Sequence, residues 1–429
     1  MKKGLIIFSL ATLCVTSQAQ EGWTLRQCID YAIEHNIEIQ QTANEAEQNA
    51  IEVNTAKWAR LPNLSGSAGQ NWSWGRSQSP KDNTYSDVNS GSTQFGLNTN
   101  VPLFTGLQLP NQYALSKLNL KAAIEDLNKA KEDIAINVTS SYLQVLFNME
   151  LSKVAASQTE LSKEQCKRII RLAEVAEAKA RVAQDEMSLV QAENNYQLAL
   201  LDLSQLLELP TPEGFTLAQP DTVVNFAPLT APDDIYTEAL SNKPGIRAAQ
   251  FRLEGSEKSI RIAQSNYYPQ LSFGASIGTN FYTLNGSAEH SFGSQLKNNL
   301  NKGIGFNLSV PLFNRLATRN RVRSARLQQT NLALQLNNTK KVLYKEIQQA
   351  WYNAVAAESK FNSSMAAVTA NEESFRLMSE KFDNGKATFV EYNEAKQNLT
   401  KSLSDKIQAK YDYLFRTKIL DFYKGKAIE

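Results

Sequence analysis

The tetrapeptide Val-Pro-Leu-Phe occupies residues 101–104 and returns letter for letter at residues 310–313. A run of alternating apolar and polar residues leads into each copy, over residues 94–101 and 304–310. A period of two residues is typical of a strand with one apolar and one polar face. Because proline cannot donate to a strand ladder or continue a preceding helix, Pro102 and Pro311 are expected to mark the corners where a strand gives way to a helix.

The tetrapeptide belongs to an internal repeat. Pro62 and Pro269 are 207 positions apart, whereas the two tetrapeptides are 209 positions apart. A period of about 208 residues in a chain of 429 indicates two copies of one unit, with a slightly longer loop in the second copy. Five of the twelve prolines fall between Leu209 and Asp233. We therefore expect a first repeat at 20–209, a proline-rich linker at 210–232 and a second repeat at 233–429.

The N-terminus predicts export. Lys2 and Lys3 precede an apolar run over residues 5–15, and Ser17-Gln18-Ala19 has the small-x-small pattern of a cleavage site. A signal peptide is therefore expected at 1–19. Cys14 offers the alternative of a lipid-anchored protein, although Leu13 is larger than the residue that usually precedes an acylated cysteine.

Charge and motifs exclude several classes of function. Without Lys2 and Lys3 the 45 basic residues become 43, equal to the 43 acidic ones, so no nucleic-acid partner is expected. The only histidines are His35 and His290, and neither a P-loop nor a nucleophile elbow nor a zinc motif is present. An enzyme, a cofactor and a metal site are therefore not predicted. Cys28 and Cys166 are interpreted as small buried hydrophobic residues, with a disulfide between them as the alternative.

Long helices make up most of the chain. No proline or glycine occurs between Pro110 and Pro210, and we expect a helix over 111–174, a break near Ala178 and a helix over 181–209. The second repeat predicts helices at 232–266, 316–382 and 388–423, and a first helix spans about 23–60. A coiled-coil seam is predicted from apolar residues at alternating spacings of three and four. Its members are Leu120, Ala123, Leu127, Ala130 and Ile134 in the first repeat and Leu336, Leu343, Ile347 and Ala350 in the second.

Each repeat also predicts a pair of strands joined by a polar loop, at about 64–101 and 270–310. Strands of nine to eleven residues have the length that crosses an outer membrane. In the third strand Leu271, Phe273 and Ile277 are expected to face lipid, and the serines and glycines between them a wet interior. Four strands cannot close a barrel, and an open edge in lipid leaves backbone groups unpaired, so several chains are expected to share one barrel. The alternative is an exported coiled-coil structural or interaction protein without a pore.

Four stretches resemble one family. Residues 25–36 (Leu-Arg-Gln-Cys-Ile-Asp-Tyr-Ala-Ile-Glu-His-Asn), residues 267–271 (Tyr-Tyr-Pro-Gln-Leu) and both tetrapeptides are similar to the outer membrane efflux proteins, the TolC family. The resemblance implies a mainly α-helical protein with a membrane β portion. In such a homotrimer twelve strands form one barrel, which long antiparallel coiled-coil helices continue as a periplasmic tunnel. It also implies an outer membrane exit duct that passively serves efflux or type I secretion. The partners are then outer membrane lipid, a periplasmic adaptor and an inner-membrane pump driven by protons or ATP.

The resemblance also suggests site residues at the helix turns. Residues 381–394 are similar to the family's tip pattern, with Gly385 and Lys386 at the turn and Glu391 and Glu394 where acidic residues ring the periplasmic aperture. Three copies of these carboxylates are expected to raise one another's pKa and favour cations; the alternative is a solvated helix face. In the first repeat Ala178 takes the glycine position, and Arg181 and Asp185 are the available ionic partners. Both turns are expected to contact the adaptor.

Overall fold

The structure is a computed structural model that describes residues 22–78, 83–87, 89–168, 172–218, 226, 228–285, 288 and 290–426. The expected signal peptide at 1–19, with Cys14, lies outside the described residues, and so does part of the expected linker. The chain forms two compact units, each built from both repeats. The helical unit comprises Met1–Gln41, Lys129–Lys243 and Val342–Glu429, and the strand unit comprises Thr42–Asn128 and Pro244–Lys341.

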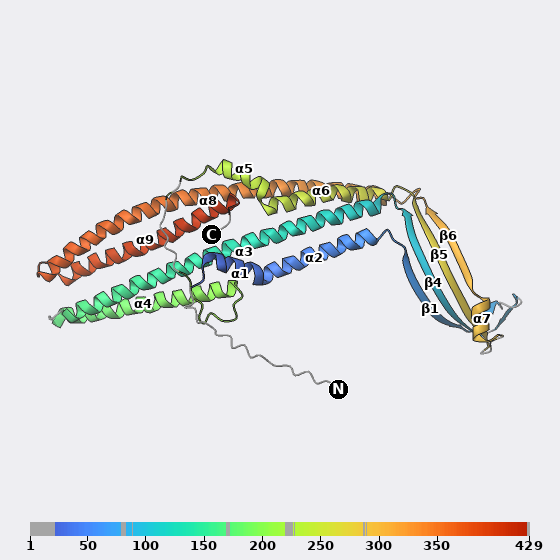
Figure 1. Cartoon of the computed structure of the whole chain (residues 1–429), viewed down its shortest axis with the longest axis horizontal. Helices are drawn as coiled ribbons and strands as arrows, with labels where there is room; N and C mark the ends of the chain where they lie inside the picture. Colours follow the sequence, from blue (N-terminus) through green and yellow to red (C-terminus); the bar gives the residue numbers. More distant parts are fainter. Residues whose placement is uncertain are drawn as a thin grey trace, which may run out of the picture. The chain divides into compact units, whose positions relative to one another are not determined.

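The two repeats follow the same order of elements (Figure 1). The first contains α1 (Leu25–His35), α2 (Ile37–Trp58), β1 (Asn63–Ser73), β2 (Arg76–Gln78), β3 (Tyr85–Asp87), β4 (Ser90–Phe104), α3 (Gln108–Arg168) and α4 (Leu172–Leu206). The second contains α5 (Pro232–Asn242), α6 (Pro244–Ser265), β5 (Gln270–Leu284), α7 (Phe292–Asn298), β6 (Asn301–Ser309), α8 (Ala317–Asp383) and α9 (Phe389–Tyr423).

The helix that opens each repeat is broken once, which the sequence analysis did not predict. The breaks fall at Asn36 and Lys243, which are equivalent positions of the two repeats, and both residues have extended backbone. Asn36 ends α1 and caps α2, because its Oδ1 accepts hydrogen bonds from the backbone N–H of Glu38 and Ile39. The break at Lys243 is caused by Pro244, because a proline disfavours the helical conformation of the residue that precedes it.

The four longer strands form one antiparallel sheet in the order β1-β4-β5-β6. Its register aligns the alternating patterns, so that Gly66, Leu97, Ile277 and Lys302 form one row and Leu64, Thr99, Ala275 and Ile304 the next. We call this side the apolar face, and it also carries Phe95, Val101, Leu271, Phe273, Phe281, Phe306 and Leu308. The opposite, polar face consists almost entirely of Ser, Gly, Asn and Gln. The predicted alternation of β5 is thus continued across all four strands.

The lengths of the strands, and one of the two predicted strand-to-helix corners, differ from what the sequence predicted. β4 and β5 each contain 15 residues, and the expected loops contain the short strands β2 and β3 and the helix α7. The expected corner at Pro102 is wrong, because β4 continues to Phe104 and α3 begins at Gln108. Pro102 is tolerated because β4 has passed the end of β1 there and pairs with β5 alone. Pro311 lies in the connection between β6 and α8, as predicted.

Within the helical unit, α3 packs beside α4 and α8 beside α9 (Figure 1). The predicted seam of the second repeat is confirmed, since Leu336, Leu343, Ile347 and Ala350 are all buried. In the first repeat only Ile134 of the predicted seam is fully buried. The seam runs instead through Leu118 and Ala122 and, further on, through Val138, Tyr142 and Val145. Several apolar faces fit a helix this rich in Leu and Ala, so the pattern alone did not select the right one.

Both described cysteines are free. Cys28 is fully buried, as predicted, and burial raises the pKa of its thiol to about 12. Cys166 is half-buried. None of the helices in the described ranges carries an apolar stretch long enough to span a membrane.

Candidate functional site

The turn between α8 and α9 has the geometry that the sequence predicted. Gly385 adopts φ +67°, a left-handed conformation that favours glycine. The backbone N–H of Lys386 donates to the carbonyl of Lys381 (2.8 Å) and that of Gly385 to Phe382 (2.9 Å). These two bonds form a Schellman motif, which ends α8 and reverses the chain.

Glu391 caps the helix that follows this turn. Its carboxylate accepts hydrogen bonds from the backbone N–H (2.8 Å) and the hydroxyl (2.9 Å) of Thr388, and the Glu391 N–H donates to Thr388 Oγ1 (3.3 Å). These bonds, led by the one from the backbone, lower the pKa of the Glu391 carboxyl. Within one chain this direction is opposite to the rise that we expected. Glu394 is exposed one turn further along α9.

The position predicted for Ala178 is wrong. Helix α3 ends at Arg168 and α4 begins at Leu172, so Ala178 lies inside α4 rather than at a turn. It is 2% exposed and packs with Phe389 and Tyr392 of α9. Cys166, Phe375 and Phe382 complete this apolar cluster, and the Tyr392 ring lies 5.0 Å from that of Phe382. Ala178 therefore joins the two repeats and has no free surface for an adaptor.

A buried ion pair lies two turns beyond this cluster. Lys396 Nζ of α9 is 3.1 Å from Asp185 Oδ2 of α4, with the two side chains 3% and 12% exposed. The Ser162 hydroxyl of α3 donates to the same carboxylate and accepts from Lys396, which also donates to the Gln158 carbonyl (3.1 Å). Burial lowers the pKa of Lys396, and Asp185 offsets part of this effect. One ammonium group thus connects α9 of the second repeat to both α3 and α4 of the first.

Arg181 extends this network toward solvent. Its Nε lies 3.5 Å from Asp185 Oδ1, so the two residues named as available ionic partners form an ion pair with each other. With the Gln397 amide turned so that its oxygen faces Arg181, that oxygen accepts hydrogen bonds from both terminal nitrogens of the guanidinium group (2.6 and 3.0 Å). Asp185 is therefore the counter-charge of two cations, Lys396, which is fully buried, and Arg181, which is partly buried.

Lys396 and Ser162 were not predicted from the sequence. A signal for Lys396 was present, because Phe389, Tyr392, Lys396 and Leu399 recur at spacings of three, four and three, so the lysine occupies a position of the apolar seam. A charge at such a position is almost never buried without a partner. Ser162 gives no comparable signal, since serine is common on both faces of these helices.

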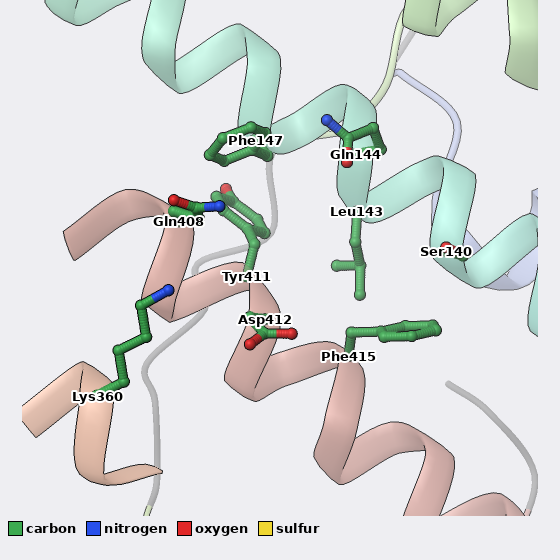
Figure 2. A pocket seen from close by; sticks show the side chains of 9 residues that line it. All are labelled: Ser140, Leu143, Gln144, Phe147, Lys360, Gln408, Tyr411, Asp412 and Phe415. Carbon is green, nitrogen blue, oxygen red and sulfur yellow. The ribbon is translucent and has the colours of Figure 1, made fainter. Parts of the chain in front are cut away.

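An open groove of about 260 Å³ lies elsewhere in the helical unit, between α3 and α9. Figure 2 shows Leu143 and Phe147 of α3 facing Phe415 and Tyr411 of α9. The Tyr411 hydroxyl donates to Glu150 (2.7 Å), and burial together with this carboxylate raises the pKa of the phenol. The groove mixes aromatic and amide groups, and among its lining residues only Lys360 and Asp412 carry charge.

In the part of the chain that the structure describes, no group of three or more His, Cys, Asp and Glu residues is placed so that it could hold a metal ion. His35 stacks on Tyr31 with ring centroids 4.0 Å apart, and its Nδ1 lies 3.0 Å from the Tyr31 carbonyl oxygen. His290 is exposed. Each histidine thus sits in a local environment of its own.

Comparison with known proteins agrees with this architecture. A model of the outer membrane efflux protein family matches twice, at residues 28–208 and 235–424. Outer membrane protein TolC of Escherichia coli strain K12 is 22% identical over 435 residues, which cover 96% of this chain and 84% of the relative. Toxin and drug export protein A of Aggregatibacter actinomycetemcomitans is 20% identical, covering 91% of this chain and 83% of the relative. The CmeC outer membrane channel of Campylobacter jejuni has a TM-score of 0.79 at 19% identity, covering 93% of this chain and 84% of that one.

The two matches of the family model follow the duplication of the chain, and together they span most of both repeats. The relatives place the chain in the outer membrane, with a large periplasmic helical part, and as a channel protein rather than an enzyme. This chain belongs to the outer membrane efflux protein family, whose members of the TolC type are efflux channels.

Proposed function

We propose that this chain is the exit duct of a tripartite efflux or type I secretion system, in which three copies form one conduit through the outer membrane. A periplasmic adaptor joins this conduit to an inner-membrane pump that uses protons or ATP. The duct itself is passive, so the energy for transport comes from the pump. Family membership argues against the alternative of an exported coiled-coil protein without a pore.

The observation that carries the proposal is the open sheet. β1 and β6 are its outer strands, and each pairs with a neighbour on one side only. The apolar face runs from one edge to the other, and Leu64, Ile304 and Phe306 at the edges are 71–81% exposed. Unpaired backbone groups cost several kcal/mol each in lipid, so an apolar sheet with two open edges favours closure by further copies.

The ends of the long helices are the proposed entrance. Glu391 and Glu394 are exposed on α9 directly after the turn, so three copies would bring six carboxylates to this end. Gly385 and Lys386 form an exposed turn on which an adaptor could dock. Because Ala178 is buried, we confine the proposed docking surface to the second-repeat turn and the exposed parts of α4 that flank it.

We further propose that the Asp185–Lys396 pair holds the entrance in its narrow form. It links α9 to α3 and α4 at the ends that carry the turns, so separating the two helix pairs requires breaking it. The apolar cluster around Tyr392 opposes the same separation. The ion pair and the apolar cluster are small, localised contacts, so an adaptor that docks at this end could break them by replacing them with its own.

The mass of the purified protein in detergent tests the assembly. We expect three chains per particle, recovered from the outer membrane fraction and resistant to dissociation below the denaturation temperature. A particle of one chain would contradict the proposal, because one chain leaves both sheet edges open.

A further inference from the structure

A strongly basic stretch of the chain leads from β6 into α8. No acidic residue occurs between Glu289 and Glu346, whereas ten basic residues do. Five of them are arginines that lie close together at the beginning of α8, and all five are exposed: Arg315, Arg319, Arg321, Arg323 and Arg326. The whole chain has 45 basic and 43 acidic residues, so this is a local excess of positive charge in a nearly neutral protein.

These five arginines have no counter-charge. Among the residues that the structure describes, no carboxylate forms an ion pair with any of them and no aromatic ring lies against them. Cations on the neighbouring helices do have partners, since Arg252 of α6 pairs with Asp126 and Lys117 of α3 lies 4.4 Å from the centre of the Tyr113 ring.

Three of the arginines share one side of α8. Arg319, Arg323 and Arg326 recur at spacings of four and three residues, which places them next to one another on the helix surface. Like charges at this spacing repel one another. An anion bound between them would relieve the repulsion.

The arginines lie beyond the end of the sheet at which α2, α3, α6 and α8 join the strands (Figure 1). The four long strands contain a single charged residue, Lys302. The connections between strands and helices at this end carry aromatic side chains that are 53–79% exposed: Trp58, Tyr267, Tyr268 and Phe313. Aromatic residues of membrane proteins gather at the level of the lipid headgroups. From β6 into α8 the chain therefore passes through apolar, aromatic and cationic residues in the order expected of a segment that leaves the lipid.

Because the chain is an outer membrane protein with a periplasmic helical part, this end of the sheet lies at the periplasmic surface of the membrane. We propose that Arg319 and Arg323 bind the phosphate groups of anionic phospholipids at this surface, with Arg315 and Arg326 on either side of them. The guanidinium group matches a phosphate because it donates two parallel hydrogen bonds. This site requires the membrane location alone and depends on neither a pump nor conduction through a channel.

The rise of α8 determines which cations reach the headgroups. Arg319 and Arg323 lie about 3 and 9 Å along the helix from its first residue, and Arg326 about 14 Å. The headgroup layer is roughly 5–8 Å thick, and a long arginine side chain can extend toward it. Lys340 and Lys341 lie about 35 Å along the same helix, several Debye lengths away. The first two arginines of α8 are therefore within reach, and the two lysines are not.

Arg315 has a backbone conformation that favours glycine. Its φ is +54°, and the equivalent residue of the first repeat, Gly106, has a φ of +60°. A Cβ atom at Gly106 would lie 2.5 Å from the Ser265 carbonyl oxygen, so only glycine fits there. Arg315 is exposed but remains strained, because its Cβ disfavours a left-handed backbone. Its side chain therefore does not stabilise this corner, which fits a role toward the membrane.

Native mass spectrometry of the detergent-solubilised protein, titrated with phosphatidylglycerol, tests the site. Each cation near an anionic membrane surface is worth a factor of about five in affinity, so Arg319→Gln with Arg323→Gln should weaken binding roughly 25-fold. Lys340→Gln with Lys341→Gln is the matched control, since it removes the same charge from the same acid-free stretch and should leave binding unchanged. Phosphatidylcholine, which has no net charge, should bind all forms alike. Equal losses in the two pairs would overturn the site, because net charge alone would then explain the binding.

Arg315→Gly separates lipid binding from folding. It should raise the temperature of thermal unfolding, because the strain is removed, and weaken phosphatidylglycerol binding about fivefold. Arg315→Lys should retain the binding, since it keeps the charge. Unchanged binding in Arg315→Gly and in the Arg319 and Arg323 pair would overturn the proposal.

Three other outcomes would also overturn it, each by showing what the arginines contact instead. Glycerol phosphate that binds as tightly as the lipid would identify a site for soluble anions. A smaller particle mass in the Arg319 and Arg323 pair, with unchanged lipid binding, would show that the arginines meet acidic groups of another copy. A change in the anion selectivity of the channel, again with unchanged lipid binding, would show that they line the conduit.

Discussion

Replacing Asp185 with asparagine removes the negative charge from the pair with Lys396 while keeping the shape of the side chain. The Lys396 side chain is 3% exposed, and its ammonium group then retains the hydrogen bonds to Ser162 Oγ and the Gln158 carbonyl but has no counter-charge. At 3.1 Å and an effective dielectric constant of about 20, the lost attraction is about 5 kcal/mol before solvation is counted. Since removing one member of a buried pair leaves an uncompensated charge, we expect Asp185→Asn to cost about 3–5 kcal/mol.

Removing both charges should cost much less. Burial lowers the pKa of Lys396 in spite of Asp185, so the attraction does not fully offset the cost of desolvating the ammonium group. Lys396→Met combined with Asp185→Asn replaces that group with an apolar side chain of similar length. We therefore expect the double variant to lie within about 1–2 kcal/mol of the unmodified protein.

Native-state hydrogen exchange measures this coupling without unfolding the whole protein. Amides of α9 next to Lys396, such as that of Thr400, should exchange about a hundredfold to a few thousandfold faster in Asp185→Asn, because about 3–5 kcal/mol is lost and each 1.4 kcal/mol corresponds to a factor of ten. The double variant should recover most of the protection. Equal exchange in the single and double variants would refute the buried pair as the contact between the repeats.

The pH dependence gives a second test of the same pair. Because the pKa of Lys396 is lower in the folded chain than its ordinary value of 10.5, the unfolded chain binds more protons between the two values. Stability therefore increases as the pH rises through this window. Asp185 raises the pKa of Lys396, so its removal widens the window. The loss of stability caused by Asp185→Asn should therefore become smaller as the pH approaches 10.5, because the buried Lys396 becomes neutral. The double variant has no lysine at this position, so its stability relative to the unmodified protein should not improve in the same way.

Four further predictions concern the rest of the helical unit. Lys243→Met should destabilise the folded protein by about 1–3 kcal/mol, because Glu132 (3.3 Å) and the Phe422 carbonyl (3.0 Å) lose the ammonium group that donates to them. Adding Glu132→Gln should restore part of the thermal stability, because it removes the unpaired charge. Gly385→Ala should lower the free energy of unfolding by about 1–2 kcal/mol, because residue 385 has a positive φ that strains any residue with a Cβ. Thermal unfolding measures this loss, and Lys386→Ala, which should be nearly neutral, is the control. The hydrogen bonds between Glu391 and Thr388 should weaken as the pH falls through the lowered pKa of the Glu391 carboxyl, so that the first amides of α9 become less protected from exchange. Glu391→Gln keeps the hydrogen bonds but cannot titrate, so in this variant the protection should not change over the same pH range. Glu391→Ala with Glu394→Ala should weaken block by divalent cations, and unchanged block in single-channel recordings would remove the proposed acidic ring.

The sequence predicted the strands of the sheet better than it predicted their ends. All four long strands were expected, three of them from alternation, and the apolar positions of β5 lie on the face that was assigned to them. The tetrapeptide did not fix its own conformation, since residues 101–104 end a strand and residues 310–313 do not. Local sequence gives a strand its tendency, but pairing requires a partner, which only the arrangement of strands supplies.

The site was predictable where backbone geometry requires a particular residue. Gly385 marked its turn because only glycine adopts a positive φ without strain. Ala178 was misplaced because alanine favours helix and carries no signal for a turn, so its assignment rested on alignment alone. Lys396 was missed because its role depends on Asp185, more than 200 positions away in the sequence. Contacts of that range follow from how the two repeats pack, which periodicity within one helix does not reveal.

Single-channel conductance of the purified protein in a planar lipid bilayer tests the central claim most directly. We expect long-lived, uniform channels of low conductance in the unmodified protein and a higher conductance in Asp185→Asn, since the entrance is then less firmly held. A protein that inserts into the bilayer as an assembled complex yet conducts no ions, in both forms, would contradict its role as an exit duct.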